Sequence, residues 1–291
     1  MAGAAFVLIG DRLLPAGEAC LPVSDRGFLF GDAVYETLRA YAGRPFQLDA
    51  HLERLARSAA AIYLELPWSA ATLTERLGGL LAANRIDAGR IRITVTRGPG
   101  DVRRRLDQLG PPTLVMTADP FTPLEEARYA RGVPVEIARR PRNLPGALDP
   151  AIKSGNLLNT LLARFEMRDA ESFEVLMLNH RGELGEASLA NLFLVDAAGR
   201  LRTPPLGSGI LPGITRALVL ELAAAEGLDP DEGPVLPEAL LAAREAFLTA
   251  STLEVLAISH VDGTPLAAAA GPVTRRLLAR YRERVAAELH L

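Results

Sequence analysis

Segments with strand periodicity alternate with segments of helical periodicity along this chain, and residues 118–132, which have no clear period, separate two unequal halves. Polar and apolar residues alternate over 90–96, as in a half-buried strand, while Leu52, Leu55 and Ala59 recur at helical spacing. A chain of 291 residues is also long for one small core. The pattern therefore predicts two domains of the α/β (α+β) class.

The expected elements follow from period, turn residues and helix caps. We predict strands over residues 6–9, 39–41, 45–48, 90–96, 113–117, 133–138, 174–178, 191–195 and 247–249. We predict helices from Asp49 as N-cap to Pro67, and over residues 70–84, 156–167, 214–226 and 273–289. The domains are placed at residues 1–118 and 133–291, joined by a linker over 119–132.

Composition narrows the class of protein. With 49% hydrophobic and 23% charged residues, the chain is typical of a globular enzyme, and its net charge of −3 gives no basic footprint for nucleic acid. Cys20 is the only cysteine, which fits a reducing compartment. No signal peptide and no apolar run long enough for a bilayer are recognisable. A cytoplasmic protein without membrane or nucleic-acid partners is expected.

Lys153 is the only lysine among 32 basic residues. Arginine can supply charge and solubility, but it cannot act as a nucleophilic amine. Lysine can form a Schiff base with a carbonyl cofactor or substrate. A general preference for arginine would also leave one lysine by chance, and composition alone does not separate these two interpretations.

Several common catalytic patterns are missing. The four histidines and one cysteine show no HExxH or CxxC spacing, so no metal site is expected. Residues 211–216 place a turn before a helix, where the amides of Ile214 and Thr215 could bind a phosphate or take part in simple capping. A hydroxyl-rich turn follows a strand at 249–252, and alone it is only a turn.

Glu186 precedes small residues and an apolar strand. Most such acids are exposed loop residues. A carboxylate beside a pyridine ring would instead keep the ring nitrogen protonated, as pyridoxal 5'-phosphate (PLP) requires. One amine, one phosphate site and one acid are the minimum set for that cofactor.

Four ordered motifs in the chain match those of a known family. The chain resembles the class IV aminotransferases, the fold-type IV PLP enzymes that include D-amino-acid transaminase, branched-chain aminotransferase and aminodeoxychorismate lyase. The resemblance rests on the segments DRGFLFGD (25–32), KSGNLL (153–158), residues 186–193 and residues 211–216, and it extends to residue 263. It implies a small N-terminal α/β domain, a larger C-terminal PLP-binding domain with a β-barrel-like core, and a homodimer.

The same resemblance implies roles for individual residues. Lys153 would be the Schiff-base residue and the proton carrier of a transamination between amino acids and α-keto acids. Glu186 would pair with the pyridine nitrogen, and Leu211 would pack against the ring. The phosphate would be bound by Arg54, Ile214, Thr215, Ser251 and Thr252.

Substrate residues and the branch of the family are harder to assign. Tyr35, Thr37 and Arg39 would line the substrate pocket. The TVTRG run (94–98) resembles the D-amino-acid transaminase and lyase branches, and the Tyr-x-Arg-Pro pattern of branched-chain enzymes is absent there. Candidates for the carboxylate clamp are Arg97 and one of the arginines at positions 103, 104 and 105.

We therefore expect a transaminase with D-amino-acid preference. The alternatives are aminodeoxychorismate lyase and branched-chain L-amino-acid aminotransferase. A cofactor-free Schiff-base aldolase would have no use for Glu186 or the phosphate site, and a catalytically silent binding protein would tolerate Lys153→Arg.

Overall fold

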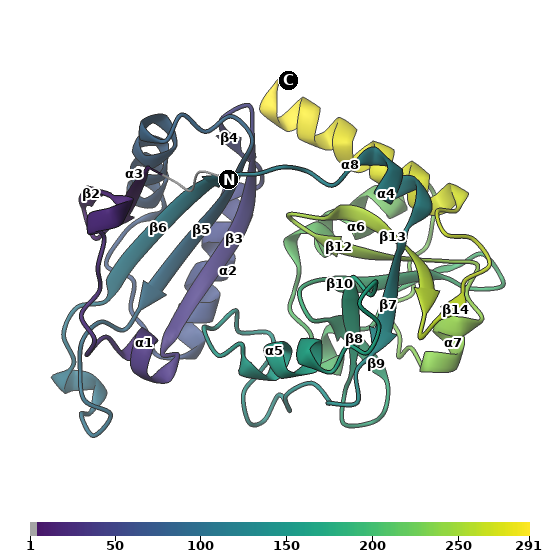
Figure 1. Cartoon of the computed structure of the whole chain (residues 1–291), viewed down its shortest axis with the longest axis horizontal. Coiled ribbons are helices and arrows are strands. Elements are labelled where there is room, and N and C mark those ends of the chain that lie inside the picture. The colour runs from purple at the N-terminus through teal and green to yellow at the C-terminus, as the bar shows by residue number, and fades with distance from the viewer. Residues whose placement is uncertain (1–4) are drawn as a thin grey trace. The chain divides into compact units, whose positions relative to one another are not determined.

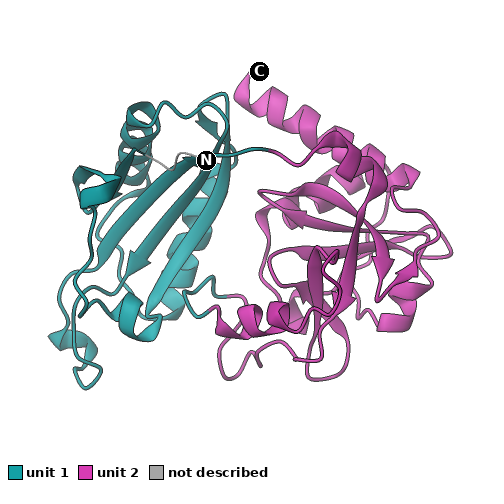
Figure 2. Ribbon diagram, viewed as in Figure 1, with its two compact units in different colours: residues 1–122, 152–156, 291 teal, residues 123–151, 157–290 magenta. Residues whose placement is uncertain are grey.

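The computed structural model describes residues 5–291, so the first four residues of the predicted N-terminal domain lie outside it. Two compact units are present, coloured separately in Figure 2. The first comprises the described residues up to Thr122 together with residues 152–156 and Leu291, and the second comprises residues 123–151 and 157–290. Residues 152–156 thus pack in the first unit although they follow the predicted linker.

The first unit is built on one antiparallel sheet with the strand order β2-β1-β6-β5-β3-β4 (Figure 1). Its strands are β1 (Phe6–Ile9), β2 (Arg12–Pro15), β3 (Ala33–Tyr41), β4 (Arg44–Pro45), β5 (Gly89–Thr96) and β6 (Thr113–Pro120). Helices α2 (Leu48–Ala61) and α3 (Ala70–Ala83) pack on one face through buried residues such as Leu55 and Leu77. The opposite face carries polar residues of β3 and β5.

Three short helices complete the described part of the first unit. They are η1 (Ala16–Glu18), α1 (Arg26–Phe30) and η2 (Leu106–Gln108). The Asp25 carboxylate caps α1 by accepting from the amide of Gly27, and Gly31 ends the helix in the left-handed conformation. A Cβ on Gly31 would lie 2.8 Å from Asn156 Oδ1, so both backbone conformation and space favour glycine there.

The second unit contains a closed ring of strands in the order β10-β12-β13-β7-β8-β9, because β9 pairs with both β8 and β10. The ring strands are β7 (Val133–Ile137), β8 (Glu174–Leu178), β9 (Leu184–Ala187), β10 (Asn191–Val195), β12 (Glu245–Ala250) and β13 (Glu254–Val261). Strands β11 (Leu201–Arg202) and β14 (Thr264–Pro265) extend this sheet. The expected α/β (α+β) class with a barrel-like second core is confirmed.

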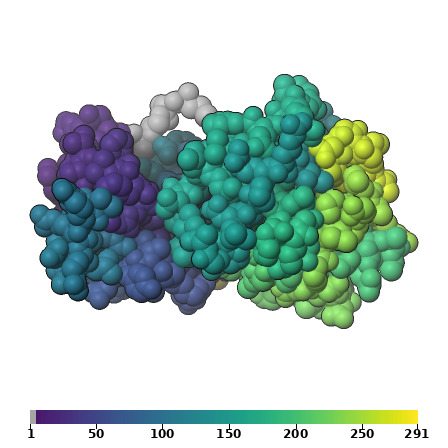
Figure 3. Space-filling view, turned by 90° about the horizontal axis from the view of Figure 1, so that it is seen from below, coloured from purple at the N-terminus to yellow at the C-terminus, as the bar shows by residue number. Residues whose placement is uncertain are grey.

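Helices surround the ring of strands. They are α4 (Glu126–Arg131), α5 (Leu158–Phe165), η3 (Leu206–Ser208), α6 (Ile214–Ala225), α7 (Pro237–Leu241) and α8 (Pro272–Leu289). Helix α8, yellow in Figure 3, buries Leu277, Tyr281 and Val285 and exposes Arg276 and Arg280. None of the helices between residues 5 and 291 combines the length and apolarity that a bilayer crossing requires.

Several strands were predicted with accurate bounds, while helix ends and short elements were less well predicted. The predicted strands at 174–178 and 191–195 match β8 and β10, and Ile91, Ile93 and Val95 are buried as the alternation requires. Asp49 is not an N-cap, because α2 begins after Gln47, which adopts a left-handed conformation. The predicted strand at 45–48 is wrong beyond Pro45, because β4 ends there and α2 begins at Leu48. Strands β2, β9, β11, β13 and β14 and helices α1, α4 and α7 were not predicted, and α4 lies inside the expected linker.

Candidate active site

Lys153 lies beside the start of β3 in the first unit. Its carbonyl accepts a hydrogen bond from the amide of Tyr35 at 2.9 Å, and its own amide donates to Ser58 Oγ of α2 at 3.1 Å. Ser154 forms a bridge with Val34, and the amide of Gly155 donates to Ala33 at 2.7 Å. The backbone around the lysine is thus fixed like an added strand segment.

The side chains of Lys153 and Tyr35 lie together. Nζ of Lys153 is 4.6 Å from the centroid of the Tyr35 ring, and Cζ of Arg92 is 3.8 Å from the same centroid. Two cationic groups therefore contact one aromatic ring, an arrangement that the ring quadrupole stabilises. Tyr35 is the predicted substrate residue that the structure brings to the candidate catalytic amine.

Thr37 and Arg39 follow Tyr35 on the same face of β3, since side chains two residues apart share a face. Thr37 is paired in register with Arg92 of β5. Arg39 is buried, and its guanidinium contacts the rings of Tyr41 at 4.2 Å and Phe121 at 5.0 Å. This face of the sheet is consequently aromatic and cationic, a combination suited to binding carboxylates.

Arg54, the predicted phosphate ligand, lies in α2 and pairs with Glu36 of β3. Arg54 Nε donates to Oε1 of Glu36 at 2.8 Å and Nη2 donates to Oε2 at 2.7 Å. His51 Nδ1 lies 2.8 Å from the same Oε2. All three side chains are buried.

The protonation states in this cluster follow from burial and pairing. Burial alone would raise the pKa of the Glu36 carboxyl, but hydrogen bonds and charge from Arg54 and His51 outweigh it and lower the pKa to about 2. Burial lowers the pKa of His51 below its ordinary value, and the attraction of Glu36 opposes this shift. Glu36 is therefore a carboxylate and His51 a neutral ring near pH 7.

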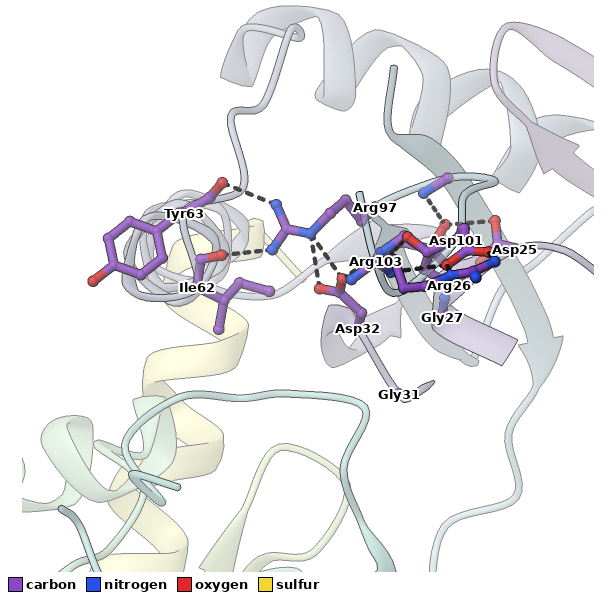
Figure 4. Close-up of polar contacts among 12 residues, drawn as sticks. Asp25, Arg26, Gly27, Gly31, Asp32, Ile62, Tyr63, Arg97, Asp101 and Arg103 are labelled. Carbon is purple, nitrogen blue, oxygen red and sulfur yellow. Dashed lines mark hydrogen bonds and ion pairs between the residues drawn. The ribbon is translucent and has the colours of Figure 1, made fainter. Parts of the chain in front are cut away.

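Arg97, expected to bind substrate, is engaged elsewhere. Its Nε donates to both oxygens of Asp32 at 2.8 and 3.0 Å, and its two other nitrogens donate to the carbonyls of Ile62 and Tyr63 (Figure 4). Asp32 also accepts from Arg26 Nε at 2.9 Å. In the structure Arg97 thus ties the end of β5 to the chain after α2 through a bond from each of its three side-chain nitrogens, and its role in substrate binding stays a prediction.

The arginine run that begins at Arg103 lies in an exposed loop. Arg103 is 86% exposed and pairs with the neighbouring Asp101, whose carbonyl accepts from Arg26 Nη1 at 2.8 Å (Figure 4). Arg105 is also exposed and lies 3.5 Å from Asp107. Both arginines therefore pair with acids of their own loop, and their role in substrate binding stays a prediction.

Glu186 lies on β9 of the second unit and is only 4% exposed, unlike a loop acid. Its Oε1 accepts from Nη2 of Arg142 at 2.7 Å and from Nε at 3.0 Å. Its Oε2 accepts from the amide of Leu211 at 3.0 Å and from Asn191 Nδ2 at 3.3 Å. The chain therefore holds this acid as an ionised, oriented carboxylate.

Asn191 joins Glu186 to the turn before α6. Besides its bond to Glu186, its Nδ2 donates to the carbonyl of Leu211 at 3.0 Å. A Cβ on Gly213 would lie 2.0 Å from Asn191 Oδ1, so the turn can pass this close only with glycine. Helix α6 then starts at Ile214 with no side-chain cap from the described residues, and Thr215 is buried.

Ser251 and Thr252 form the turn between β12 and β13. Thr249, at the end of β12, pairs in register with Asn191, so the two side chains share a face of the ring of strands. Within the chain that the structure describes, Thr249 Oγ1 is buried without a hydrogen-bond partner. A buried hydroxyl of this kind calls for a polar ligand or water.

These observations fit a phosphorylated pyridine cofactor. The amino end of α6 and the unsatisfied Thr249 hydroxyl are suited to an anion, and the buried Glu186 carboxylate is suited to a protonated ring nitrogen. Lys153 offers the only lysine amine. The residues present thus match the chemistry of PLP.

The sequence analysis did not identify four residues that contact the candidate site residues: Glu36, Arg92, Arg142 and Asn191. The alternating polar face of β5 was a signal for Arg92, since it lies across from Thr37. Arg142 is separated from Glu186 by 44 positions in the sequence. No local pattern indicates such a pair.

Comparison with known proteins agrees with these features. A family model described as amino-transferase class IV matches residues 33–261. A putative branched-chain-amino-acid aminotransferase from Methanocaldococcus jannaschii is 32% identical over 95% of both chains. A D-alanine aminotransferase from Listeria innocua is 34% identical over 93% of both chains.

A solved structure shows the same similarity in three dimensions. The branched-chain aminotransferase of the thermophilic archaeon Thermoproteus uzoniensis, determined with norvaline, superimposes with a TM-score of 0.90. The match covers 97% of this chain and 95% of that chain at 31% identity. Similarity therefore extends over nearly the full length of the sequence.

Proposed function

Since the chain belongs to the class IV aminotransferases, which use PLP, we propose that it transfers an amino group from a D-amino acid to an α-keto acid through Lys153. The observation that carries the proposal is the position of Lys153 Nζ beside the Tyr35 ring, which Arg92 also contacts. An amine beside an aromatic ring that also contacts a guanidinium suits an amino-acid substrate with a carboxylate.

The proposal assigns a role to individual residues of each unit. When bound, PLP supplies an aldehyde for covalent attachment and an electron-withdrawing ring. Lys153 would provide the amine for attachment and would accept and return the proton of the substrate Cα. Glu186 would hold the ring nitrogen protonated, and Leu211 would pack against the ring. The phosphate would be held by Arg54, Ile214, Thr215, Ser251 and Thr252.

The substrate carboxylate is assigned to the cationic face of the first sheet. Arg92 lies beside the ring that also contacts Lys153, whereas the nitrogens of Arg97 are bonded to Asp32 and two carbonyls. Tyr35, Thr37 and Arg39 complete this face, and Arg103 or Arg105 is kept as an additional carboxylate contact. A guanidinium can bind a carboxylate through two parallel hydrogen bonds.

The D-amino-acid preference is supported by the TVTRG run and by the D-alanine aminotransferase relative. Branched-chain L-amino-acid transfer is the second candidate, favoured by the similarity to the Thermoproteus uzoniensis structure. A half-reaction screen separates them. PLP-loaded protein is mixed with D-alanine, D-glutamate, L-leucine or (R)-1-phenylethylamine, and the cofactor absorbance is followed to the pyridoxamine form.

Conversion with D-alanine but not L-leucine is expected. The reverse pattern would assign the branched-chain activity. Release of pyruvate from aminodeoxychorismate, with no half-reaction for any of the four amines, would assign the lyase activity. Lys153→Arg protein serves as the control in every arm, because it retains the charge but cannot form the covalent link.

A homodimer is part of the same proposal. Helix α1 exposes Phe28, Leu29 and Phe30, with Phe28 at 73% exposure. Adjacent exposed apolar side chains of this size are typical of surfaces that bind another protein. Sedimentation of the wild type and of Phe28→Asp should show a dimer for the former and a larger monomer fraction for the latter. A wild-type protein that sediments as a monomer at micromolar concentration would overturn the dimer.

A further inference from the structure

Three ionisable side chains form a cluster inside the first unit, between β3 and α2. Glu36, His51 and Arg54 are 0%, 1% and 4% exposed, respectively. They belong to a core otherwise made of residues such as Leu38 and Leu55. Buried ion pairs are no more stabilising than well-packed apolar residues of similar volume, so stability alone does not explain this cluster.

The carboxylate fixes one edge of the Arg54 guanidinium. Nε and Nη2 donate to the two oxygens of Glu36 at 2.8 and 2.7 Å, which is a bidentate pairing. A planar guanidinium held at two donors cannot rotate about its last bonds. Nη1 takes no part in this pairing, and its direction is set by the other two nitrogens.

His51 also contacts the Glu36 carboxylate. An ionised carboxylate accepts hydrogen bonds only, so the contact of 2.8 Å requires Nδ1 of His51 to carry the proton. His51 is neutral near pH 7, because burial disfavours its charged form and lowers its pKa. The cluster thus contains one positive and one negative charge.

The backbone connects this cluster to Lys153. The amide of Tyr35, next to Glu36, donates to the Lys153 carbonyl at 2.9 Å. Ser58, one helical turn after Arg54, accepts from the Lys153 amide at 3.1 Å. Strand β3 and helix α2 therefore hold the arginine and the lysine in a fixed relation within one unit.

We infer that Glu36 and His51 are positioning residues that orient the Arg54 guanidinium for the phosphate of the cofactor and set its place relative to the Lys153 amine. This inference rests on the proposed function, in which Arg54 binds the phosphate and Lys153 the aldehyde. Neither Glu36 nor His51 contacts the cofactor. Both act through Arg54.

The test compares a ligand that has the phosphate with one that lacks it. Cofactor is removed from the full-length protein, and PLP or pyridoxal is titrated back, with binding followed by absorbance. Glu36→Gln and His51→Leu are expected to raise the Kd for PLP by roughly 10- to 100-fold, the usual effect of losing an outer partner of a ligand-binding group. Binding of pyridoxal, which has no phosphate, should change far less than binding of PLP.

Two further variants separate positioning from general damage to the fold. His51→Asn keeps an N–H donor near the Nδ1 position and is expected to recover most of the PLP affinity that His51→Leu loses. Glu53→Gln removes an exposed glutamate from the same helix and should bind PLP like the wild type. Circular dichroism at the titration temperature identifies any variant that has not folded. If Glu36→Gln does not fold, the inference is tested by comparing the PLP affinity of His51→Asn with that of His51→Leu.

The outcomes distinguish this inference from the proposed function. Equal loss of PLP and pyridoxal binding in folded Glu36→Gln protein would overturn the positioning role, because the effect would not depend on phosphate. Unchanged PLP binding in that variant would overturn it as well. Wild-type protein that binds neither compound would overturn the proposed function itself.

Discussion

Arg142 holds the Glu186 carboxylate through two hydrogen bonds of 2.7 and 3.0 Å, so the acid expected to face a pyridine nitrogen already has a cationic partner in the chain. Nη1 of Arg142 donates in turn to Thr160 Oγ1 at 2.9 Å, which anchors the arginine on α5. If PLP binds as proposed, its ring nitrogen would be a second cationic partner of Glu186 beside this fixed guanidinium.

Arg142→Met should destabilise the cofactor-free protein. The substitution leaves Glu186 buried without its cation, and breaking a buried pair in this way costs roughly 3 kcal/mol. Urea unfolding of the cofactor-free variant measures this loss, and PLP should restore part of it because the ring nitrogen supplies a new partner. An unfolding midpoint equal to that of the wild type would contradict the prediction.

Lys153→Arg should abolish attachment of the cofactor and lower transaminase turnover by at least about a hundredfold, since the proton carrier is lost. Borohydride reduction followed by peptide mapping checks this directly. A modified peptide containing Lys153 is expected in the wild type and none in the variant. Modification at a different residue of active protein would refute the assignment.

Gly213→Ala should weaken cofactor binding. The added Cβ would lie 2.0 Å from Asn191 Oδ1, so the turn before α6 must move and the amides at the start of the helix move with it. We expect roughly a tenfold rise in the Kd for PLP, about 1.4 kcal/mol.

Gly207→Ala is the matched control for this substitution, because a Cβ at Gly207 meets no atom within 4 Å. Both variants are measured by the same absorbance titration. Equal affinities for the two alanine variants would show that the turn geometry does not matter for the phosphate.

Acid should destabilise the first unit through Glu36. Its pKa in the folded protein is about 2, below the ordinary 4.5, so its contribution is fully present above pH 4.5 and is lost as the pH falls toward 2. That contribution is roughly 3 kcal/mol. The charges that act on Glu36 are those of Arg54 and, when protonated, His51, which in turn is influenced by Lys153.

His51 also makes the folded protein less stable as the pH falls, but in a higher pH range than Glu36. Because its folded pKa lies below 6.5, the unfolded chain takes up the proton first, and stability begins to fall below about pH 6.5. Urea unfolding between pH 7 and 3 should show a smaller acid loss for Glu36→Gln than for the wild type. Parallel curves for the two proteins would rule out this source of acid sensitivity.

Sequence alone predicted the parts of the fold that have a clear local period. The alternation in β5 appears in the structure with the expected buried residues, and of the stripe expected in α8, Leu277, Tyr281 and Val285 are buried while Val273 is only partly so. Strand β13 was missed, and its burial on both faces leaves no polar–apolar alternation to indicate it, although β8 and β10, equally buried, were predicted. Helix α1 was missed because it has only five residues and depends on the Asp25 cap.

In the candidate site, residues with a local sequence signal were predicted, whereas their partners from distant segments were not. Lys153 and Glu186 stood out through rarity and motif, and the structure places one beside Tyr35 and buries the other. Partners such as Glu36 for Arg54 depend on strand register and on which face of α2 meets the sheet. Such contacts over a long sequence separation arise only when the chain has folded.

The ends of the first sheet have one more consequence. Its outermost strands are short, and each contains a proline and an arginine: Arg12 and Pro15 in β2, Arg44 and Pro45 in β4. Proline cannot donate a ladder hydrogen bond, and charge at an edge discourages pairing with a strand of a neighbouring molecule. In the other sheet β9 and β10 close the ring, and the strands that extend it, β11 and β14, have only two residues each, so the chain is poorly suited to edge-to-edge aggregation at high concentration.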